Sequence, residues 1–155
     1  MRTGAQLLCD ALEAAGVRHA FGLPGTQDIA LHEALRGSRI QFVNTTHELA
    51  ASFMANGYYR ASGRLAPVFA IPGPGFMYAL TGLAEAAHDS AAVLLLVGAP
   101  PEGERSFQFQ WLDQAGLAGP IAKAVVHLRE AGQVERDTHR AVALALGEEP
   151  GPVVL

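Results

Sequence analysis

The sequence predicts an α/β fold of three layers, in which helices cover both faces of a mostly parallel sheet of about six strands. Short apolar runs alternate with longer segments whose apolar residues recur at helical spacing. The run from Ala92 to Val97 contains no polar residue, as expected for a strand covered on both faces. Glycine-bearing turns follow two of the runs, as strand-to-helix turns do in such a sheet.

The helices are predicted from apolar periodicity and from residues that start and stop helices. Thr3 can cap the first helix in a capping box with Gln6, and Gly16 is its expected C-terminal stop. The later helices are expected from Thr26 or Asp28 to about Arg36, from His47 to Ser62, from Phe76 to Asp89, from Phe107 to Ala115 and from Val134 to Leu146.

The strands are predicted from short apolar runs that end at turn residues. They are expected at Val17 to Phe21, Ile40 to Val43, Ala66 to Ile71, Ala92 to Val97, Ile121 to Val126 and Pro152 to Leu155. Gly22-Leu23-Pro24-Gly25 ends the first strand and Pro72-Gly73-Pro74-Gly75 the third. Gly98 to Arg105 is expected to be a loop.

Composition narrows the possible functions. The 155 residues suit one domain, and a net charge of −4 without a basic stripe argues against nucleic acid as a partner. The first residues do not form a signal peptide pattern, and the longest apolar run is too short to span a bilayer. We therefore expect a cytoplasmic protein with no membrane partner.

The single cysteine, Cys9, is expected to be a buried apolar residue without a disulfide in the chain.

Several motifs of common single-domain enzymes are absent. The sequence has no P-loop and no Gly-x-Ser-x-Gly elbow. Gly73-Pro74-Gly75 begins like a dinucleotide fingerprint, but Tyr78 occupies the third glycine position. His47-Glu48 is followed by Ala51 where a zinc-binding pair needs a second histidine, so no metal ligands are expected in this chain.

Glu48 is the leading candidate for a functional residue. It follows an expected strand and lies in the first turn of an apolar helix, on the sheet edge where ligands bind in parallel α/β folds. A carboxylate there is either a partner of the helix dipole or a catalytic group. The position alone leaves both interpretations open.

Five segments, in order, resemble the pyrimidine-binding (PYR) domain of thiamine-diphosphate-dependent enzymes, in particular the acetolactate synthase and 2-oxoacid decarboxylase group. The resemblance covers nearly the whole chain. It rests on Phe21-Gly22-Leu23-Pro24-Gly25; on His47-Glu48 with Gly57-Tyr58 and Arg60-Ala61-Ser62-Gly63; on Gly73-Pro74-Gly75 with Leu80-Thr81-Gly82-Leu83-Ala84; on Phe109-Gln110 with Asp113, Pro120 and Lys123; and on Pro150-Gly151-Pro152-Val153.

The resemblance implies thiamine diphosphate as cofactor and a small 2-oxoacid as substrate. Glu48 would be the catalytic residue, because the family's helix-start glutamate hydrogen-bonds a ring nitrogen of the aminopyrimidine and so activates the cofactor. The implied cofactor-binding residues are Pro24, Gly25, Glu48, Gly73, Pro74 and Gly75, and Phe109 and Gln110 would face the substrate.

The family holds Mg²⁺ and the diphosphate through a Gly-Asp-Gly motif on a separate domain, and this sequence has no such motif. Residues 1–155 are therefore expected to form a single PYR-type domain, as a fragment of a longer enzyme or as one subunit of a split enzyme. The chain alone is expected to be inactive. The complete enzyme would decarboxylate a 2-oxoacid, as a lyase, or also ligate the product, as a transferase.

The expected assembly is a homodimer, a higher oligomer, or a complex with a partner chain that carries the diphosphate-binding domain. Two alternatives stay open. One is the α subunit of a split decarboxylase similar to sulfopyruvate decarboxylase. The other is a non-catalytic assembly domain of the same fold, for which the bulky Phe76-Met77-Tyr78 is the only hint in the sequence.

Overall fold

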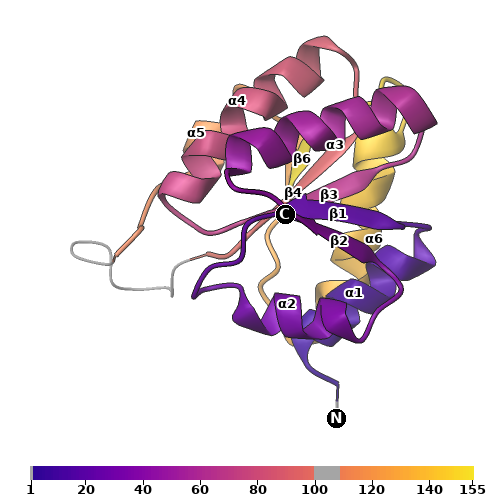
Figure 1. Ribbon diagram of the computed structural model, residues 1–155, viewed down its shortest axis with the longest axis vertical. Helices are drawn as coiled ribbons and strands as arrows, with labels where there is room; N and C mark the ends of the chain where they lie inside the picture. The colour runs from indigo at the N-terminus through magenta and orange to yellow at the C-terminus, as the bar shows by residue number, and fades with distance from the viewer. Residues whose placement is uncertain (1, 100–108) are drawn as a thin grey trace.

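The computed structural model describes residues 2–99 and 109–155, which form a six-stranded sheet between two layers of helices (Figure 1). The strand order is β2-β1-β3-β4-β6-β5, and every pair is parallel. The strands are β1 (His19–Gly22), β2 (Gln41–Asn44), β3 (Ala66–Ala70), β4 (Val93–Val97), β5 (Ala124–Val125) and β6 (Val153–Val154). The helices are α1 (Gly4–Ala14), α2 (Ile29–Arg36), α3 (Glu48–Ser62), α4 (Pro74–His88), α5 (Gln114–Ala118), η1 (Ala131–Gln133) and α6 (Val134–Leu146). The predicted fold class is confirmed.

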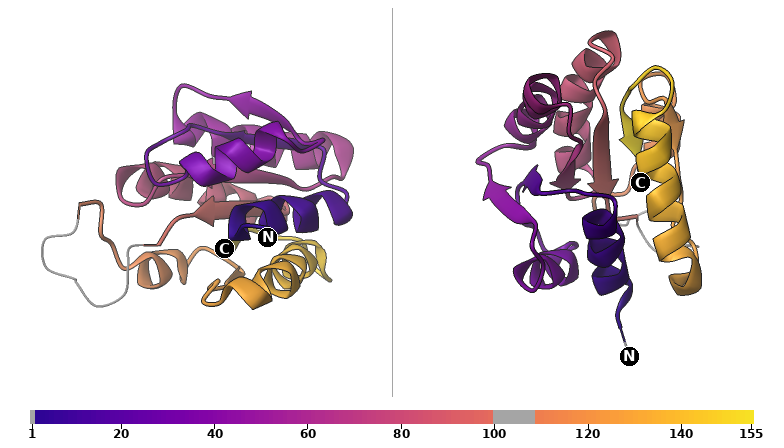
Figure 2. Two further views of the ribbon diagram at one scale, coloured as in Figure 1. Left: turned by 90° about the horizontal axis from the view of Figure 1, so that it is seen from below. Right: turned by 90° about the vertical axis from the view of Figure 1, so that its right-hand side faces the viewer.

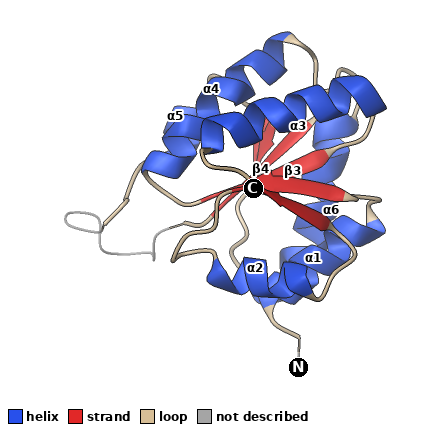
Figure 3. Cartoon of the chain, viewed as in Figure 1, coloured by secondary structure: helices blue, strands red, loops and turns tan. Residues whose placement is uncertain are grey.

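Two hydrophobic cores lie on opposite faces of the sheet (Figure 3). Helices α1, α2 and α6 cover one face, and α3 and α4 cover the other. Successive residues of β4 alternate between the cores, so Leu94 packs under α1 and α6 while Leu95 packs under α4. Both residues are fully buried, which explains why this strand has no polar position. Helices α1 and α6 come from opposite ends of the chain and pack side by side (Figure 2).

The predicted signals at the ends of α1 are confirmed. The Gln6 N–H donates to Thr3 Oγ1 at 3.2 Å, and the Thr3 N–H donates to Gln6 Oε1 at 2.9 Å, so both halves of the capping box form. Gly16 follows the helix with φ +85°, in the left-handed region that favours glycine. Cys9 is buried on the inner side of α1, as predicted.

The helix predicted from Phe107 to Ala115 is wrong. Phe107 lies outside the described residues, and Gln110 has φ +65°, which no α-helix accommodates. The helix observed in this region is α5, which starts after Asp113, whose Oδ1 accepts from the Gly116 N–H at 3.0 Å. The cap residue thus fixes the start of the helix after Asp113.

Two further predictions need adjustment. Strand β5 is shorter than the predicted strand from Ile121 to Val126, because the N–H groups of Ile121 and Ala122 both donate to the Ala118 carbonyl and prolong the turn after α5. Most of the loop predicted at 98–105 lies outside the described residues. None of the helices within 2–99 and 109–155 is both long and apolar enough to cross a membrane.

The strand order reverses at the carboxyl edge between β1 and β3, which we call the switch-point edge. The chain leaves β1 toward α2 on one face of the sheet, and it leaves β3 toward α4 on the other. Ligands bind at such a switch point in open α/β sheets, because the two loops diverge there. Figure 1 looks onto this edge, with α2 below the strands and α4 above them.

Candidate functional site

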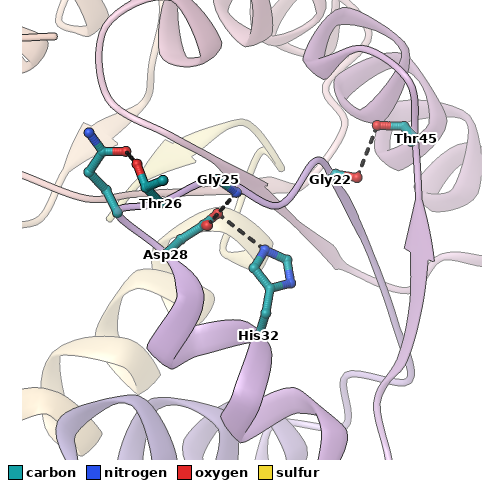
Figure 4. A network of polar contacts seen from close by, with 7 residues as sticks. Gly22, Gly25, Thr26, Asp28, His32 and Thr45 are labelled. Atoms are coloured by element: carbon teal, nitrogen blue, oxygen red, sulfur yellow. Dashed lines mark hydrogen bonds and ion pairs between the residues drawn. The ribbon is translucent and has the colours of Figure 1, made fainter.

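Glu48 is the first residue of α3, directly after the link that follows β2. Thr45 ties this link to the end of β1, because its N–H and its Oγ1 donate to the Gly22 carbonyl at 2.8 and 3.1 Å (Figure 4). His47 caps α3 by accepting the Leu49 N–H at Nδ1, 3.2 Å away, and its ring packs on Tyr78 at a centroid distance of 4.6 Å. Hydrogen bonds made by Thr45, before Glu48, and by Leu49, after it, thus fix the backbone on either side of this residue.

The Glu48 carboxylate lies at the switch-point edge. Only 6% of the residue is exposed, and a Cβ on Gly75 would lie 2.7 Å from Oε1, so the carboxylate lies against the first turn of α4. Nearby polar side chains bond elsewhere: Thr45 to Gly22, and Ser52 to the Leu49 carbonyl at 2.9 Å. Within the described part of the chain the carboxylate has no hydrogen-bond partner, and its oxygens are not among the fully buried atoms that lack one, so the carboxylate can bond a ligand.

Ile71 connects the two predicted turns. Gly25 packs so closely on the Ile71 side chain that any Cβ at Gly25 would overlap it, and a Cβ on Gly75 would lie 2.8 Å from Ile71 Cγ1. The two glycines therefore leave space that this one apolar side chain fills. Pro24, in contrast, is exposed at the tip of the first turn. The predicted residues Gly25, Gly75 and Glu48 are brought together through Ile71, which the sequence analysis did not single out.

The turn before α4 needs glycine for its backbone. Gly73 has φ +75° and ψ −121°, a region that residues with a side chain rarely adopt, and it precedes Pro74 in the first turn of the helix. Gly73 is buried and Pro74 is exposed. A Cβ on Gly73 would lie 2.7 Å from Gln110 Cβ, so Gln110 covers this turn.

The two predicted substrate-side residues behave differently. Gln110 lies over Gly73, and its Oε1 accepts from Nε2 of Gln27, which belongs to the turn after β1. Gln110 therefore spans both turns of the site. Phe109 is 82% exposed and is not brought to the site in this structure.

Asp28 is a site residue that the sequence analysis named only as a possible helix start. It is 2% exposed, and its Oδ1 accepts from the Gly25 N–H at 2.7 Å (Figure 4). Its Oδ2 lies 3.2 Å from His32 Nε2. The signal in the sequence was an aspartate three residues after the turn glycine, a spacing at which the side chain can reach back to the backbone.

The site borders an exposed apolar surface on α3 and α4, which we call the outer α3–α4 face. Its large members are Phe53, Met54, Met77 and Tyr78. Phe76, in contrast, is fully buried in the core between these helices and the sheet. Of the bulky Phe76-Met77-Tyr78, the first residue thus lies in the core and the other two lie on the surface.

Among the described residues, no group of three or more His, Cys, Asp or Glu side chains is placed to hold a metal ion. The chemical features of this edge are therefore the Glu48 carboxylate, which no described residue bonds, the Asp28 carboxylate, which Gly25 and His32 engage, and the apolar surface of Ile71. This set suits a flat, partly apolar ring that offers a hydrogen-bonding nitrogen to a carboxylate.

Comparisons with known proteins agree with this geometry. The family described as "Thiamine pyrophosphate enzyme, N-terminal TPP binding domain" matches residues 2–117. The chain is 34% identical to an acetolactate synthase of Arthrospira platensis, with 99% of this chain and 27% of the relative covered. It is 35% identical to a probable acetolactate synthase large subunit of Methanocaldococcus jannaschii, with 97% of this chain and 26% of the relative covered. It is also 35% identical to an acetolactate synthase large subunit of Lactococcus lactis, with 97% of this chain and 27% of the relative covered. The chain thus spans about a quarter of the length of these relatives.

Proposed function

Since the chain belongs to the thiamine pyrophosphate enzymes, as their N-terminal TPP binding domain, we propose that it supplies the aminopyrimidine side of a thiamine diphosphate site, with Glu48 as the catalytic residue. One observation carries this proposal: Glu48 is 6% exposed at the switch-point edge, against the first turn of α4, and no described residue forms a hydrogen bond with its carboxylate. The carboxylate is therefore available to a ligand that reaches this edge.

The residues at this edge fit the aminopyrimidine ring. Glu48 is an acceptor that can share a proton with a weakly basic ring nitrogen, and exclusion of water strengthens that hydrogen bond. Ile71 offers the ring an apolar contact, and Gly25 and Gly75 make room for the Ile71 side chain beside Glu48. When bound, thiamine diphosphate supplies the electron sink for decarboxylation of a 2-oxoacid. Glu48 holds and releases the proton at its carboxylate oxygens, and Gln110 covers the turn on the substrate side.

The complete reaction in this proposal is that of an acetolactate-synthase-like enzyme, which decarboxylates a 2-oxoacid and ligates the product to a second carbonyl compound. The names of the similar proteins support this choice. Mg²⁺ and the diphosphate would be held by a domain or subunit outside residues 1–155, either in a longer polypeptide or in a partner chain. We place the enzyme in the cytoplasm.

We further propose that the outer α3–α4 face meets a second protein chain of the same enzyme. Phe53, Met54 and Met77 are each more than 40% exposed there, and Tyr78 is 50% exposed. Tyr78 contacts His47, the residue before Glu48, so this face adjoins the site. Exposed apolar side chains in one patch are typical of protein interfaces.

A Glu48→Gln variant of the complete enzyme, expressed from its native gene with any chain that copurifies, tests the catalytic assignment. We expect turnover to fall about 10²- to 10⁴-fold, because glutamine cannot take up the proton that a carboxylate shares. The matched control is Glu85→Gln on the exposed side of α4, which should retain full turnover. Unchanged turnover in Glu48→Gln would rule out the catalytic role.

The mass of the native protein and its thiamine diphosphate content complete this test. A chain several times longer, or a partner of similar size, with bound cofactor supports a fused or a split enzyme, respectively. A lone chain of 155 residues that binds no thiamine diphosphate when the cofactor and Mg²⁺ are supplied would overturn the proposal.

A further inference from the structure

We infer that Asp28 is a positioning residue, which fixes one wall of the proposed aminopyrimidine site by holding the backbone of Gly25. This inference rests on the proposed function. Asp28 does not itself contact Glu48 through any hydrogen bond, and its role is to keep the turn after β1 in the shape that the site requires.

The Asp28 side chain does not form the hydrogen bond that an N-cap residue usually makes. Asp28 is the N-cap residue of α2, where an aspartate ordinarily accepts an N–H of the first helical turn, yet no such bond forms. Its Oδ1 instead turns back to the Gly25 N–H at 2.7 Å, and the Asp28 N–H donates to the Gly25 carbonyl at 3.3 Å. The carboxylate thus stabilises the turn rather than the helix.

The other carboxylate oxygen is held by His32, one helical turn later. His32 Nε2 lies 3.2 Å from Oδ2, within hydrogen-bond distance, and can donate to it when this nitrogen carries the proton. The His32 ring packs edge-on against Phe42, at a centroid distance of 4.7 Å, and is tilted on Phe69 at 5.8 Å. Both oxygens of Asp28 are therefore engaged, and the side chain is 3% exposed, so its position is determined by the core.

An unbroken series of close contacts leads from Asp28 to Glu48. Asp28 holds Gly25, Gly25 packs on Ile71, Ile71 packs on Gly75, and Gly75 contacts the Glu48 carboxylate. Neither glycine leaves room for a side chain of its own, because a Cβ at either position would overlap Ile71, and at Gly75 also the Glu48 carboxylate. A turn that lost its hydrogen bond to Asp28 would release Ile71 and change the space beside Glu48.

Two substitutions separate this role from a purely structural one. Asp28→Asn keeps an oxygen for the Gly25 N–H and places an amide against His32, whose Nε2 can accept in its other tautomer. Asp28→Ala removes both bonds and leaves the half-buried Gly25 N–H without its side-chain partner. Glu33→Ala, an exposed position on the same helix, is the matched control.

The test measures thiamine diphosphate binding to the complete enzyme by calorimetry in the presence of Mg²⁺, together with thermal stability and amide hydrogen exchange of residues 23–28. We expect Asp28→Ala to raise the dissociation constant about tenfold or more and to speed exchange at Gly25, while Asp28→Asn and Glu33→Ala stay within about threefold of the parent. Where Asp28→Ala does not fold, His32→Phe, which keeps the aromatic packing and removes the donor to Oδ2, is expected to weaken binding in the same direction.

Wild-type affinity in Asp28→Ala, with only its melting temperature lowered, would overturn the inference and leave the proposed function intact. The same holds for wild-type affinity in His32→Phe when Asp28→Ala cannot be obtained. If the parent enzyme binds no thiamine diphosphate, the proposed function fails and the inference fails with it. If Asp28→Ala weakens binding while Glu48→Gln retains full turnover, the positioning role stands and only the catalytic assignment of Glu48 fails.

Discussion

At the scale of single residues, the two glycines before and in the first turn of α4 are needed for different reasons. Gly73 is needed for its backbone, because φ is +75°. Gly75 is needed for space, because the Glu48 carboxylate and Ile71 occupy the volume of a side chain. Gly57, in the middle of α3, has neither constraint, since nothing lies within 4 Å of a Cβ placed there. The three glycines therefore carry different consequences on substitution.

We predict that Gly75→Ala destabilises the protein by about 1–3 kcal/mol and weakens cofactor binding, because the added methyl group would lie 2.7 Å from Glu48 Oε1 and 2.8 Å from Ile71 Cγ1. Gly57→Ala, the matched control, should be neutral or stabilising by up to about 1 kcal/mol, since alanine favours the helix. Urea denaturation and calorimetry measure both effects. Equal stability of the two variants would contradict the close contact at Gly75.

At the scale of secondary-structure elements, a carboxylate on α1 holds the chain just before β2. The Arg39 N–H donates to Glu13 Oε1 at 2.8 Å, and Arg39 Nε lies 2.7 Å from Oε2. These bonds, first the backbone one and then that of the side chain, lower the pKa of the Glu13 carboxyl from its ordinary value. The link fixes how β2 enters the sheet.

This link predicts an acid-dependent loss of stability. Because the pKa of Glu13 is lower in the folded state, its stabilisation is fully present above the unfolded pKa and is lost as pH falls through the folded pKa. We expect Glu13→Gln to reduce the free energy of unfolding at pH 7 by about 1 kcal/mol or less, since the pair lies near solvent, and the difference to shrink below the ordinary pKa of a glutamate. Urea denaturation between pH 7 and pH 3, with Glu33→Gln on α2 as control, gives the comparison. A difference that is constant with pH would exclude an ionic contribution.

At the scale of the whole molecule, the sheet is covered unequally. The face under α1, α2 and α6 is closed by helices whose outer sides are largely polar, while the outer α3–α4 face exposes four large apolar side chains. The two helices pack tightly on each other, since a Cβ on Gly82 would overlap Ser52. They therefore form one continuous surface beside the proposed cofactor site.

We predict that Phe53→Glu combined with Met77→Glu shifts the complete enzyme toward smaller species and raises the dissociation constant of its assembly about tenfold or more. The reason is that carboxylates would enter an apolar contact, and in a symmetric dimer they would also face each other. Leu146→Glu, on exposed apolar surface at the end of α6, should not change the assembly. Analytical ultracentrifugation over a concentration series measures the difference. An unchanged mass distribution would show that this face is not an interface.

Much of the fold follows from local patterns. The capping box of Thr3 and Gln6, the uninterrupted apolar run of β4 and the glycine turns depend only on neighbouring residues, so they can be recognised in the sequence. The position of Glu48 at the ligand-binding edge follows in the same way, because the carboxyl ends of parallel strands lie on one side of a sheet. Where an irregular segment replaces a regular element, as at Gln110, the same patterns fail.

Local sequence patterns predict the fold class, and they place Glu48 at the carboxyl edge of the sheet. Three contacts appear only once the chain has packed: Asp28 bonds to Gly25 rather than to its own helix, Ile71 fills the space left by two glycines, and Gln110 closes over Gly73. All three have one cause. Local signals depend on residues within one helical turn or one strand, whereas these contacts depend on which strands become neighbours and on how closely the loops after them pack.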